Sequence, residues 1–391
     1  MRNPLSKTIT TIQPSGIRKF FDIVHEMKDA ISLGVGEPDF DTPWHIRDEG
    51  IYSLEKGRTF YTSNAGLKEL KIEIDKYLKR RFGVSYDYNN EIMVTVGGSE
   101  AIDIAMRAML DPGDEVLIPQ PSYVSYLPCC VLANGTPVII ELKAENQFRL
   151  TPEELEAAIT PKTKLLVLPF PNNPTGAIME KEDLEKIAEV VKKYDLFVLS
   201  DEIYSELTYT GNNHVTIASL PGMKERTITL NGFSKAYSMT GWRLGYAACN
   251  EEIVKTVNKL HQHVVTCATS FVQKAGVVAL KEEKNEVTDM VKEYQRRRDY
   301  AVKAINEIDG LSCRCPKGAF YIFINIEKLG MTGQEFAPLL LENAKVALVP
   351  GDVFGTEGDH YVRMSFANSY ENVVEGCKRL KEFVEKLRRN K

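Results

Sequence analysis

The segment Ile92-Met-Val-Thr-Val-Gly-Gly-Ser-Glu100 decides the fold class, because a short apolar run leads through two glycines into a helix. Ser99 can cap that helix. Apolar side chains then recur on one helical face at Ile102, Ala105, Met106 and Met109, before Asp111-Pro-Gly113 ends the helix. The segment therefore predicts a buried strand followed by a helix.

The same alternation continues from about Trp44 to about Lys281. Further apolar runs are separated there by helix-like stretches, and they include Glu115-Val-Leu-Ile118, Leu165-Leu-Val-Leu168, Leu196-Phe-Val-Leu199 and Thr227-Ile-Thr-Leu230. Buried strands joined by helices form mostly parallel sheets that are covered on both faces. We therefore expect an α/β fold built around such a sheet.

The two ends of the chain follow a different pattern. A charged helix is expected at Glu293–Ile308, followed by strands at Ala319–Ile324 and Tyr361–Phe366 and by a closing amphipathic helix. This order predicts a second, smaller α+β unit. The turn-rich segment Leu33-Gly-Val-Gly-Glu-Pro-Asp-Phe40 could pack on either unit.

The composition is that of an ordinary globular protein. Of 391 residues, 43% are hydrophobic and 26% are charged, and 49 Lys+Arg against 54 Asp+Glu leave a net charge of −5. At roughly 150 residues per domain, this length predicts two or three domains. The acidic balance argues against nucleic acid or an anionic membrane surface as the main partner, although it allows a local cationic pocket.

Targeting and metal signals are weak. The apolar stretch of a signal peptide is missing from Met1–Gln13, and the longest apolar run, Leu165–Phe170, is too short to span a bilayer. The seven cysteines have no C-x-x-C spacing, and His261 and His263 stand alone as a possible metal pair. We therefore expect a cytoplasmic protein with reduced thiols, no metal and no membrane partner.

Polar residues follow four of the predicted strands, at the edge where open parallel sheets bind ligands. Gly97-Gly-Ser-Glu100 offers backbone N–H groups at a helix start, which suits a phosphate. The other strand ends lead to Pro171–Gly176, to Asp201 and Tyr204, and to Ser234 and Lys235. Each feature alone is also explained as a turn, a cap or a solvated charge. Together, a phosphate site, a carboxylate and a lysine are what pyridoxal phosphate requires, because lysine forms a Schiff base and aspartate pairs with a pyridinium nitrogen.

Four motifs closely resemble those of the class I pyridoxal-phosphate aminotransferases of fold type I, of the aspartate and aromatic type. They are Asn173-Pro-Thr-Gly176, Ser200-Asp-Glu-Ile-Tyr204, Ser234-Lys-Ala-Tyr-Ser-Met-Thr-Gly-Trp-Arg-Leu-Gly-Tyr246 and Tyr361-Val-Arg-Met-Ser-Phe366, and the resemblance covers nearly the whole chain. It implies a large domain around a mostly parallel seven-stranded sheet sandwiched by helices, with a small α+β domain from both chain ends. The implied division is an arm and part of the small domain at 1–43, the large domain at 44–281 and the rest of the small domain at 282–391.

The resemblance also implies roles around the cofactor ring. Lys235 would carry pyridoxal phosphate as a Schiff base and then act as the base that moves the α-proton, a task that a lowered pKa assists. Asp201 would pair with the pyridine nitrogen and keep it protonated, so that the ring accepts electrons. Tyr204 and Asn173 would hydrogen-bond the phenolic oxygen, and Tyr123 would stack on the ring face.

The implied phosphate site combines a helix start with hydroxyl and guanidinium groups, from Gly98, Ser99, Glu100, Ser234 and Arg243. Tyr61 would reach the phosphate of the neighbouring subunit's cofactor, which implies a homodimer. Many relatives carry a hydroxyl residue three positions before the lysine, where this chain has Gly232. That departure removes one side-chain contact to the phosphate.

Arg363 is the implied receptor for the substrate's α-carboxylate, since a guanidinium can hold a carboxylate with two parallel hydrogen bonds. Val362, Met364 and Phe366 alternate with it along the predicted strand, so this apolar set can enter a core while Arg363 faces the other way. Other positions expected to touch the substrate are Gly36, Tyr123 and Asn173.

The expected reaction is ping-pong transfer of an amino group between an L-amino acid of aspartate, aromatic or glutamate type and a 2-oxo acid such as 2-oxoglutarate. Aspartate-preferring relatives often carry a lysine in the place of Ser99, and segments such as Ile31–Phe40 and Thr227–Ser234 resemble aromatic-type members. Two alternatives stay open. One is a β-lyase of the cystathionine-cleaving type on the same cofactor. The other is a regulator that binds pyridoxal phosphate without turnover, which would need a DNA-binding module for which we expect no spare domain.

Overall fold

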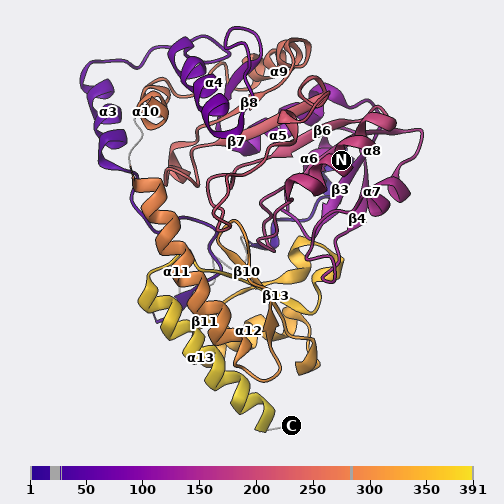
Figure 1. Ribbon diagram of the computed structural model, residues 1–391, viewed down its shortest axis with the longest axis vertical. Coiled ribbons are helices and arrows are strands. Elements are labelled where there is room, and N and C mark those ends of the chain that lie inside the picture. The colour runs from indigo at the N-terminus through magenta and orange to yellow at the C-terminus, as the bar shows by residue number, and fades with distance from the viewer. Residues whose placement is uncertain (1, 18–26, 28, 282–284, 390–391) are drawn as a thin grey trace.

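The computed structural model describes residues 2–17, 27, 29–281 and 285–389, and its largest element is a seven-stranded sheet. In spatial order the strands are β2 (Ile92–Thr95), β8 (Gly245–Ala248), β7 (Thr227–Gly232), β6 (Phe197–Asp201), β5 (Thr163–Leu168), β3 (Glu115–Gln120) and β4 (Thr136–Glu141). Neighbouring strands are parallel except at β8, which is antiparallel to both β2 and β7. The predicted α/β fold around a mostly parallel sheet is therefore confirmed (Figure 1).

Both faces of this sheet are buried. Successive side chains of a strand point to opposite faces, and each face packs against a different apolar core. Leu165 and Val167 of β5 pack with residues of α5 (Gly97–Met109), α6 (Tyr126–Leu132) and α9 (Glu251–Val264). Leu166 and Leu168 pack instead with residues of α7 (Pro152–Ala158) and α8 (Lys181–Lys193). The end formed by β2 and β8 is covered by α3 (Trp44–Glu55), α4 (Lys68–Phe82) and α10 (Ser270–Lys281).

A smaller unit lies below the large sheet in Figure 1 and contains the C-terminus, whereas the N-terminus lies beside α6 of the large unit. Its four-stranded antiparallel sheet has the order β12 (Val349–Pro350), β13 (Tyr361–Ser365), β10 (Tyr321–Asn325) and β9 (Ser312–Cys313). A separate parallel pair joins β1 (Ile31–Ser32) to β11 (Val346–Ala347). The helices of this unit are α11 (Glu286–Asn306), α12 (Gly333–Ala344) and α13 (Tyr370–Arg389), and they share one apolar core with the strands.

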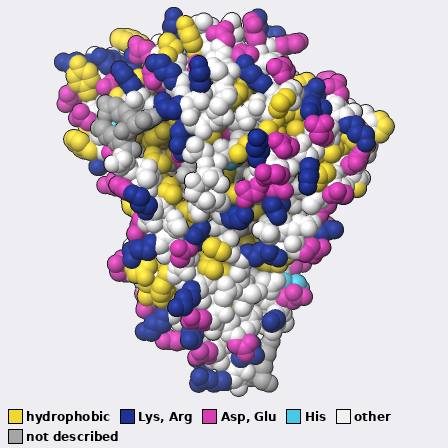
Figure 2. All heavy atoms as spheres, viewed as in Figure 1, with side chains coloured by type: hydrophobic (Ala, Val, Ile, Leu, Met, Phe, Trp, Pro, Cys, Tyr) yellow, Lys and Arg dark blue, Asp and Glu magenta, His cyan; other side chains and the backbone are white. Residues whose placement is uncertain are grey.

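Short elements complete the chain. They are α1 (Lys7–Thr11) and the 3-10 turns η1 (Ile217–Ser219), η2 (Lys224–Arg226), η3 (Thr240–Trp242), η4 (Glu327–Leu329), η5 (Gly351–Phe354) and η6 (Thr356–Gly358). Within the described residues, every helix is too short or too polar to cross a bilayer. Basic and acidic side chains are interspersed on the face shown in Figure 2, as expected from their nearly equal numbers.

Several predicted element boundaries are wrong. Ser99 does not cap the first helix, which begins at Gly97, and the Val96 N–H instead donates to Glu100 Oε2 over 2.5 Å. The strand expected at Ala319 begins at Tyr321, because Ala319 has a φ of 55° that breaks the extended run. The helix expected at Glu293–Ile308 is α11, which begins earlier and ends earlier.

The segment Leu33–Phe40 contacts both units. Leu33 belongs to the core of the smaller unit, and its carbonyl accepts a 2.6 Å hydrogen bond from the Ser365 N–H. Gly36 O accepts one from Lys235, which follows a strand of the large sheet. The domain boundaries at 43/44 and 281/282 stay predictions, and the second adjoins residues 282–284, which lie outside the described residues.

Candidate active site

A cavity of about 1020 Å³ opens where β5, β6 and β7 end. Because parallel strands end at the same sheet edge, residues far apart in sequence meet there. Most of the predicted site residues line this cavity, namely Gly36, Gly98, Ser99, Tyr123, Asn173, Asp201, Tyr204, Ser234, Lys235, Arg243 and Arg363.

Two predicted residues do not line the cavity. The carboxylate of Glu100 is used elsewhere, because Oε2 accepts from the Val96 N–H and Oε1 lies 2.7 Å from Nδ1 of the buried His261. The Glu100 side chain therefore braces the turn before α5, and the predicted contact of this helix-start residue with the phosphate stays a prediction. Tyr61 is 85% exposed in the single chain, so its predicted contact with a neighbouring subunit stays a prediction.

Lys235 follows β7 and directs its amine into the cavity. The Nζ atom donates a 2.6 Å hydrogen bond to Gly36 O and lies 5.7 Å from the centre of the Phe320 ring. Burial lowers the pKa of this amine to about 8, since the charged form loses its hydration, while the carboxylate of Glu37 opposes the shift. A lysine with such a pKa exchanges a proton near neutral pH far more readily than an exposed one.

Asp201 is the last residue of β6 and is only 9% exposed. Its Oδ2 accepts a 2.8 Å hydrogen bond from the Tyr126 hydroxyl, and its Oδ1 accepts one of 3.2 Å from the Ile203 N–H. Burial raises the pKa of the carboxyl group above its ordinary value, and these two hydrogen bonds oppose the rise. The carboxylate is thus a buried acceptor that a cationic donor from a ligand would stabilise further.

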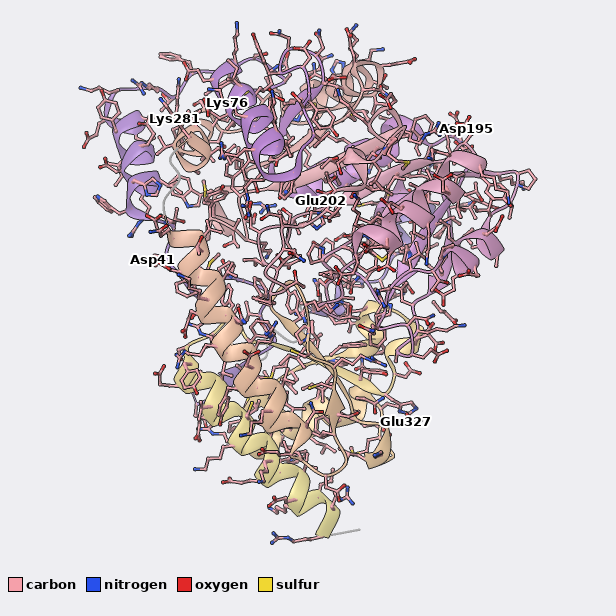
Figure 3. All side chains as sticks on the ribbon, in the orientation of Figure 1. Asp41, Lys76, Asp195, Glu202, Lys281 and Glu327 are labelled. Atoms are coloured by element: carbon pink, nitrogen blue, oxygen red, sulfur yellow. The ribbon has the colours of Figure 1, made fainter. Side chains whose placement is uncertain are left out.

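Glu202 follows Asp201 but does not line the cavity. Its Oε1 accepts hydrogen bonds from Ser200 Oγ at 2.8 Å and Thr216 Oγ1 at 2.5 Å, and its Oε2 lies 3.2 Å from Nε2 of His214. Figure 3 shows Glu202 in the interior of the molecule. Of this adjacent acidic pair, only Asp201 is available to a ligand in the cavity.

Arg363 of β13 forms the opposite wall and is 1% exposed. Its Nη1 donates to Asn173 Oδ1 over 2.8 Å and its Nη2 donates to Gly34 O over 2.6 Å. The buried Nε has no partner within the described part of the chain. A cation fixed in this way, with a free donor, suits an incoming carboxylate.

The strand alternation predicted around Arg363 is confirmed. Val362, Met364 and Phe366 belong to the core of the smaller unit, whereas Arg363 faces the cavity. The guanidinium carbon of Arg363 lies 4.3 Å from the centre of the Tyr321 ring. Burial lowers the pKa of Arg363 from its ordinary value, but guanidinium groups remain protonated in proteins.

The N-terminus of α5 and Arg243 form a second cationic end of the cavity. Gly97 has a φ of 77°, and a Cβ at this position would lie 2.6 Å from Nη2 of Arg243. Glycine therefore allows the guanidinium to approach the helix start, where the positive end of the helix dipole lies. Gly98, Ser99 and Ser234 line the same region.

Close packing explains why this chain has Gly232 where many relatives carry a hydroxyl residue. A Cβ there would lie 3.0 Å from Leu244 O, just before the neighbouring strand β8, and 3.1 Å from the Cα of Gly245, its first residue. A hydroxyl residue at this position would therefore fit only if the backbone at Leu244 and Gly245 gave way by a few tenths of an ångström.

Several lining residues were given no role in the site from the sequence. They are Ser15, Ile17, Ile102, Val124, Ser125, Tyr126, Pro169, Pro171, Ile203, Thr240 and Tyr321. Tyr126 could have been suspected, because it follows β3 closely at the same sheet edge. The described residues contain no cluster of three His, Cys, Asp or Glu side chains that could hold a metal ion.

Comparison with known proteins agrees with this geometry. The family model for aminotransferase class I and II matches residues 28–380. The chain belongs to this family. It is 50% identical to the putative aminotransferase YugH of Bacillus subtilis, over 99% of this chain and 100% of that protein. It is 47% identical to an aspartate aminotransferase of Pyrococcus abyssi, over 97% of each chain.

A solved structure of an aromatic aminotransferase from Pyrococcus horikoshii OT3 superimposes with a TM-score of 0.90 at 45% identity, covering 95% of this chain and 99% of that one. The chain is thus an aminotransferase that transfers amino groups between amino acids and 2-oxo acids, as predicted. Members of this family depend on pyridoxal phosphate.

The cavity fits this cofactor. When bound, pyridoxal phosphate supplies an aldehyde that condenses with amines and a protonated pyridine ring that accepts an electron pair. Asp201 is a buried carboxylate with room for a cationic donor, and Lys235 is a buried amine with a lowered pKa. The start of α5 and Arg243 form a cationic end that suits a phosphate group. Each part of the cofactor thus has a chemically matched group in this chain.

Proposed function

We propose that the amino transfer takes place in this cavity, with Lys235 as the residue that carries the cofactor and moves the substrate's α-proton. The observation that carries the proposal is the Lys235 amine, which lies in one cavity with Asp201 and Arg363 and has a pKa lowered to about 8. A buried lysine with a neutral fraction near physiological pH can accept a proton.

The other lining residues have matching proposed roles. Asp201 would hold the proton on the pyridine nitrogen, and the Tyr204 hydroxyl and the Asn173 amide would hydrogen-bond the phenolic oxygen. Asn173 Oδ1 accepts from Arg363, so the amide group that would donate to the cofactor is Nδ2. Tyr123 would cover the ring face, and the cationic end would hold the phosphate through Gly98, Ser99, Ser234 and Arg243.

For the substrate, Arg363 would bind the α-carboxylate beside Gly36, and apolar side chains would surround the rest of the molecule. Ile17, Ile102 and Val124 line the cavity. The cationic side chains that line it among the described residues are Lys235, Arg243 and Arg363, and each already has a proposed role, so none remains for a side-chain carboxylate of the substrate. We therefore propose that aromatic L-amino acids are better donors than aspartate. Glutamate and 2-oxoglutarate are proposed as the shared pair on the family resemblance and not on this lining.

The experiment is a set of half-reactions. Purified enzyme mixed with single amino acids should convert to the pyridoxamine form, detected by its absorbance, and phenylalanine or tyrosine should react with a higher kcat/KM than aspartate. A preference for aspartate would overturn the substrate proposal. Pyruvate released from cysteine-type substrates without any 2-oxo acid would favour a β-lyase.

Lys235→Ala should abolish turnover and the absorbance of lysine-bound cofactor, whereas Lys381→Ala, an exposed lysine on α13, should change neither. Normal amino transfer by Lys235→Ala would refute the assignment of this residue.

We also propose a homodimer, in the cytoplasm. Large apolar side chains are exposed on α3 and the following loop, with Trp44 at 62%, Phe60 at 82% and Tyr61 at 85% exposure. Such a patch favours a protein interface, and a second copy would bring its Tyr61 towards this cavity. Light scattering should give twice the mass of one chain, and Phe60→Asp should shift the protein towards monomer. A monomeric wild type would reject this part of the proposal.

A further inference from the structure

Tyr321 contacts two residues with proposed roles, although the sequence motifs give it none. It is the first residue of β10, is 1% exposed and lines the cavity. Its hydroxyl oxygen lies 2.8 Å from that of Tyr204, and its ring lies 4.3 Å from the guanidinium carbon of Arg363. One side chain thus touches the proposed partner of the cofactor's phenolic oxygen and the proposed receptor of the substrate's carboxylate.

The position of this side chain is fixed by its surroundings. A Cβ at residue 36 would lie 2.3 Å from the Tyr321 hydroxyl oxygen, so only glycine leaves room for it. The rings of Tyr321 and Tyr204 meet edge to face, with centres 5.8 Å apart and an interplanar angle of 81°. The Tyr321 hydroxyl therefore lies against Gly36 and beside the Tyr204 hydroxyl.

The direction of the bond between the two hydroxyls follows from counting protons. Either oxygen could be the donor in the chain by itself. A tyrosine hydroxyl has a single proton. If Tyr204 donates its proton to the phenolic oxygen of the cofactor, Tyr321 has to be the donor to Tyr204.

We propose that Tyr321 is a positioning residue for amino transfer: its hydroxyl donates to Tyr204 and fixes Tyr204 as a donor towards the cofactor, while its ring supports the guanidinium of Arg363. The inference rests on the proposed role of Tyr204. Hydrogen bonds in a chain polarise one another, so the bond from Tyr321 strengthens the one that Tyr204 donates. The ring contact is a cation–π interaction with a buried guanidinium.

Two variants separate these two contacts. Tyr321→Phe keeps the ring and loses the hydroxyl. It should therefore weaken the hydrogen bond that Tyr204 donates to the phenolic oxygen, and that bond favours the deprotonated form of the bound cofactor. The pH midpoint of the bound cofactor's absorbance should rise by about 0.7 unit, the equivalent of one ordinary hydrogen bond, with little change in KM for the amino acid. Tyr321→Leu loses both contacts and should raise that KM about tenfold as well.

The background variant Tyr204→Phe tests whether the hydroxyl acts through Tyr204. It should raise the midpoint more than Tyr321→Phe does, and adding Tyr321→Phe to it should have no further effect. The matched control is Tyr246→Phe, which removes a buried hydroxyl that has no hydrogen-bond partner within the described residues and should leave the midpoint unchanged.

Three results would overturn the proposal: an unchanged midpoint in Tyr321→Phe, the same shift in the Tyr204→Phe background, or an unchanged KM in Tyr321→Leu. An unchanged midpoint in Tyr204→Phe would remove its premise and overturn it too. Amino transfer by the wild type is measured separately in the half-reactions, so failure here is distinguishable from failure of the proposed function.

Discussion

The hydroxyl of Tyr126, at the start of α6, donates a 2.8 Å hydrogen bond to Oδ2 of Asp201, at the end of β6. The two residues are 75 positions apart in the sequence. Burial raises the pKa of Asp201, and this hydrogen bond lowers it again towards the ionised state. Tyr126 therefore helps to keep a buried carboxylate negative, which is the state that a pyridinium nitrogen needs.

Tyr126→Phe should lower kcat about tenfold. Loss of a hydrogen bond to a charged group costs about 1.5 kcal/mol, and every 1.4 kcal/mol is a factor of ten. The affinity for pyridoxal phosphate, measured by dialysis and absorbance, should fall as well. Tyr246→Phe serves as the control, and a Tyr126→Phe enzyme with wild-type kcat and affinity would show that Asp201 is held by other contacts.

Arg363→Lys should raise KM for the amino acid about thirtyfold, because lysine cannot reproduce two fixed hydrogen bonds together with a free donor, a difference of about 2 kcal/mol. Steady-state kinetics with one amino acid and 2-oxoglutarate would measure it. Arg379→Lys is the control, since Arg379 lies outside the cavity, where it pairs with Glu375 on α13 and donates to Asp29 O over 3.4 Å. Equal KM values in the two variants would contradict a carboxylate-binding role.

The Lys235 amine should titrate near pH 8 in the cofactor-free protein. Only the neutral amine reacts with an acylating reagent, so the labelling rate of Lys235, followed by mass spectrometry, should rise up to about pH 8 to 9 and then level off. A free lysine peptide, with a pKa of about 10.4, should continue to rise. Glu37→Gln should move the midpoint for Lys235 downwards, because the Glu37 carboxylate raises this pKa. A midpoint near 10 would contradict the burial argument.

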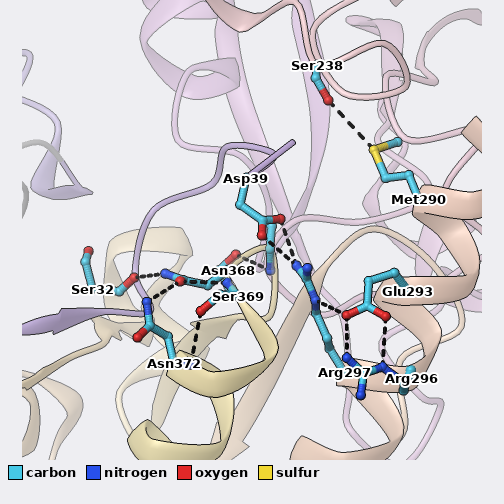
Figure 4. A network of polar contacts seen from close by, with 12 residues as sticks. Ser32, Asp39, Ser238, Met290, Glu293, Arg296, Arg297, Asn368, Ser369 and Asn372 are labelled. Carbon is cyan, nitrogen blue, oxygen red and sulfur yellow. Dashed lines mark hydrogen bonds and ion pairs between the residues drawn. The ribbon is translucent and has the colours of Figure 1, made fainter. Parts of the chain in front are cut away.

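The ion-pair network in Figure 4 predicts a pH-dependent contribution to stability. Arg297, whose side chain is 7% exposed, donates to both oxygens of Asp39 at 2.8 and 2.9 Å and to Glu293 Oε1 at 2.9 Å. Hydrogen bonds from Arg296 and Arg297 lower the pKa of Glu293 from 4.5 to about 2. Because the folded pKa lies below the ordinary one, this stabilisation is complete above about pH 4.5 and is lost as the pH falls towards 2.

Glu293→Gln should therefore lower the free energy of unfolding by about 1 kcal/mol at pH 7, and the difference from wild type should shrink below pH 4.5. Urea unfolding at a series of pH values would measure it. Glu375→Gln, which removes an exposed pair, should have a smaller effect at every pH. A difference that grows on acidification would show that the sign is wrong.

Much of the cavity was predictable because parallel strands end together. Asn173, Asp201 and Lys235 each follow an apolar run, and adjacent strands bring them to one edge. The sequence around Arg363 likewise predicted that Arg363 lies on the face of its strand opposite the apolar residues, because side chains on a strand alternate between faces. These are local patterns, and a sequence displays them directly.

Other parts of the site could not be predicted. The carboxylate of Glu100 accepts from the Val96 N–H and lies beside His261, which is 161 positions away, and no local pattern marks the second contact. Tyr321 meets Tyr204 across 117 positions, and no spacing or motif marks that contact. Ser99 has the right chemistry for a cap, but the competing bond from Val96 to Glu100 starts the helix earlier.

Residue order was enough to predict the layered fold, the edge of the sheet where the cavity lies and the residues with reactive groups, since these follow from short apolar runs and the polar residues that end them. The protonation of those groups and the direction of their hydrogen bonds depend on contacts across the fold. Burial sets the pKa of Lys235 and Asp201, and long-range neighbours such as Tyr126 and Tyr321 set which atom donates and which accepts. Such effects depend on distances across the fold, which residue order does not contain.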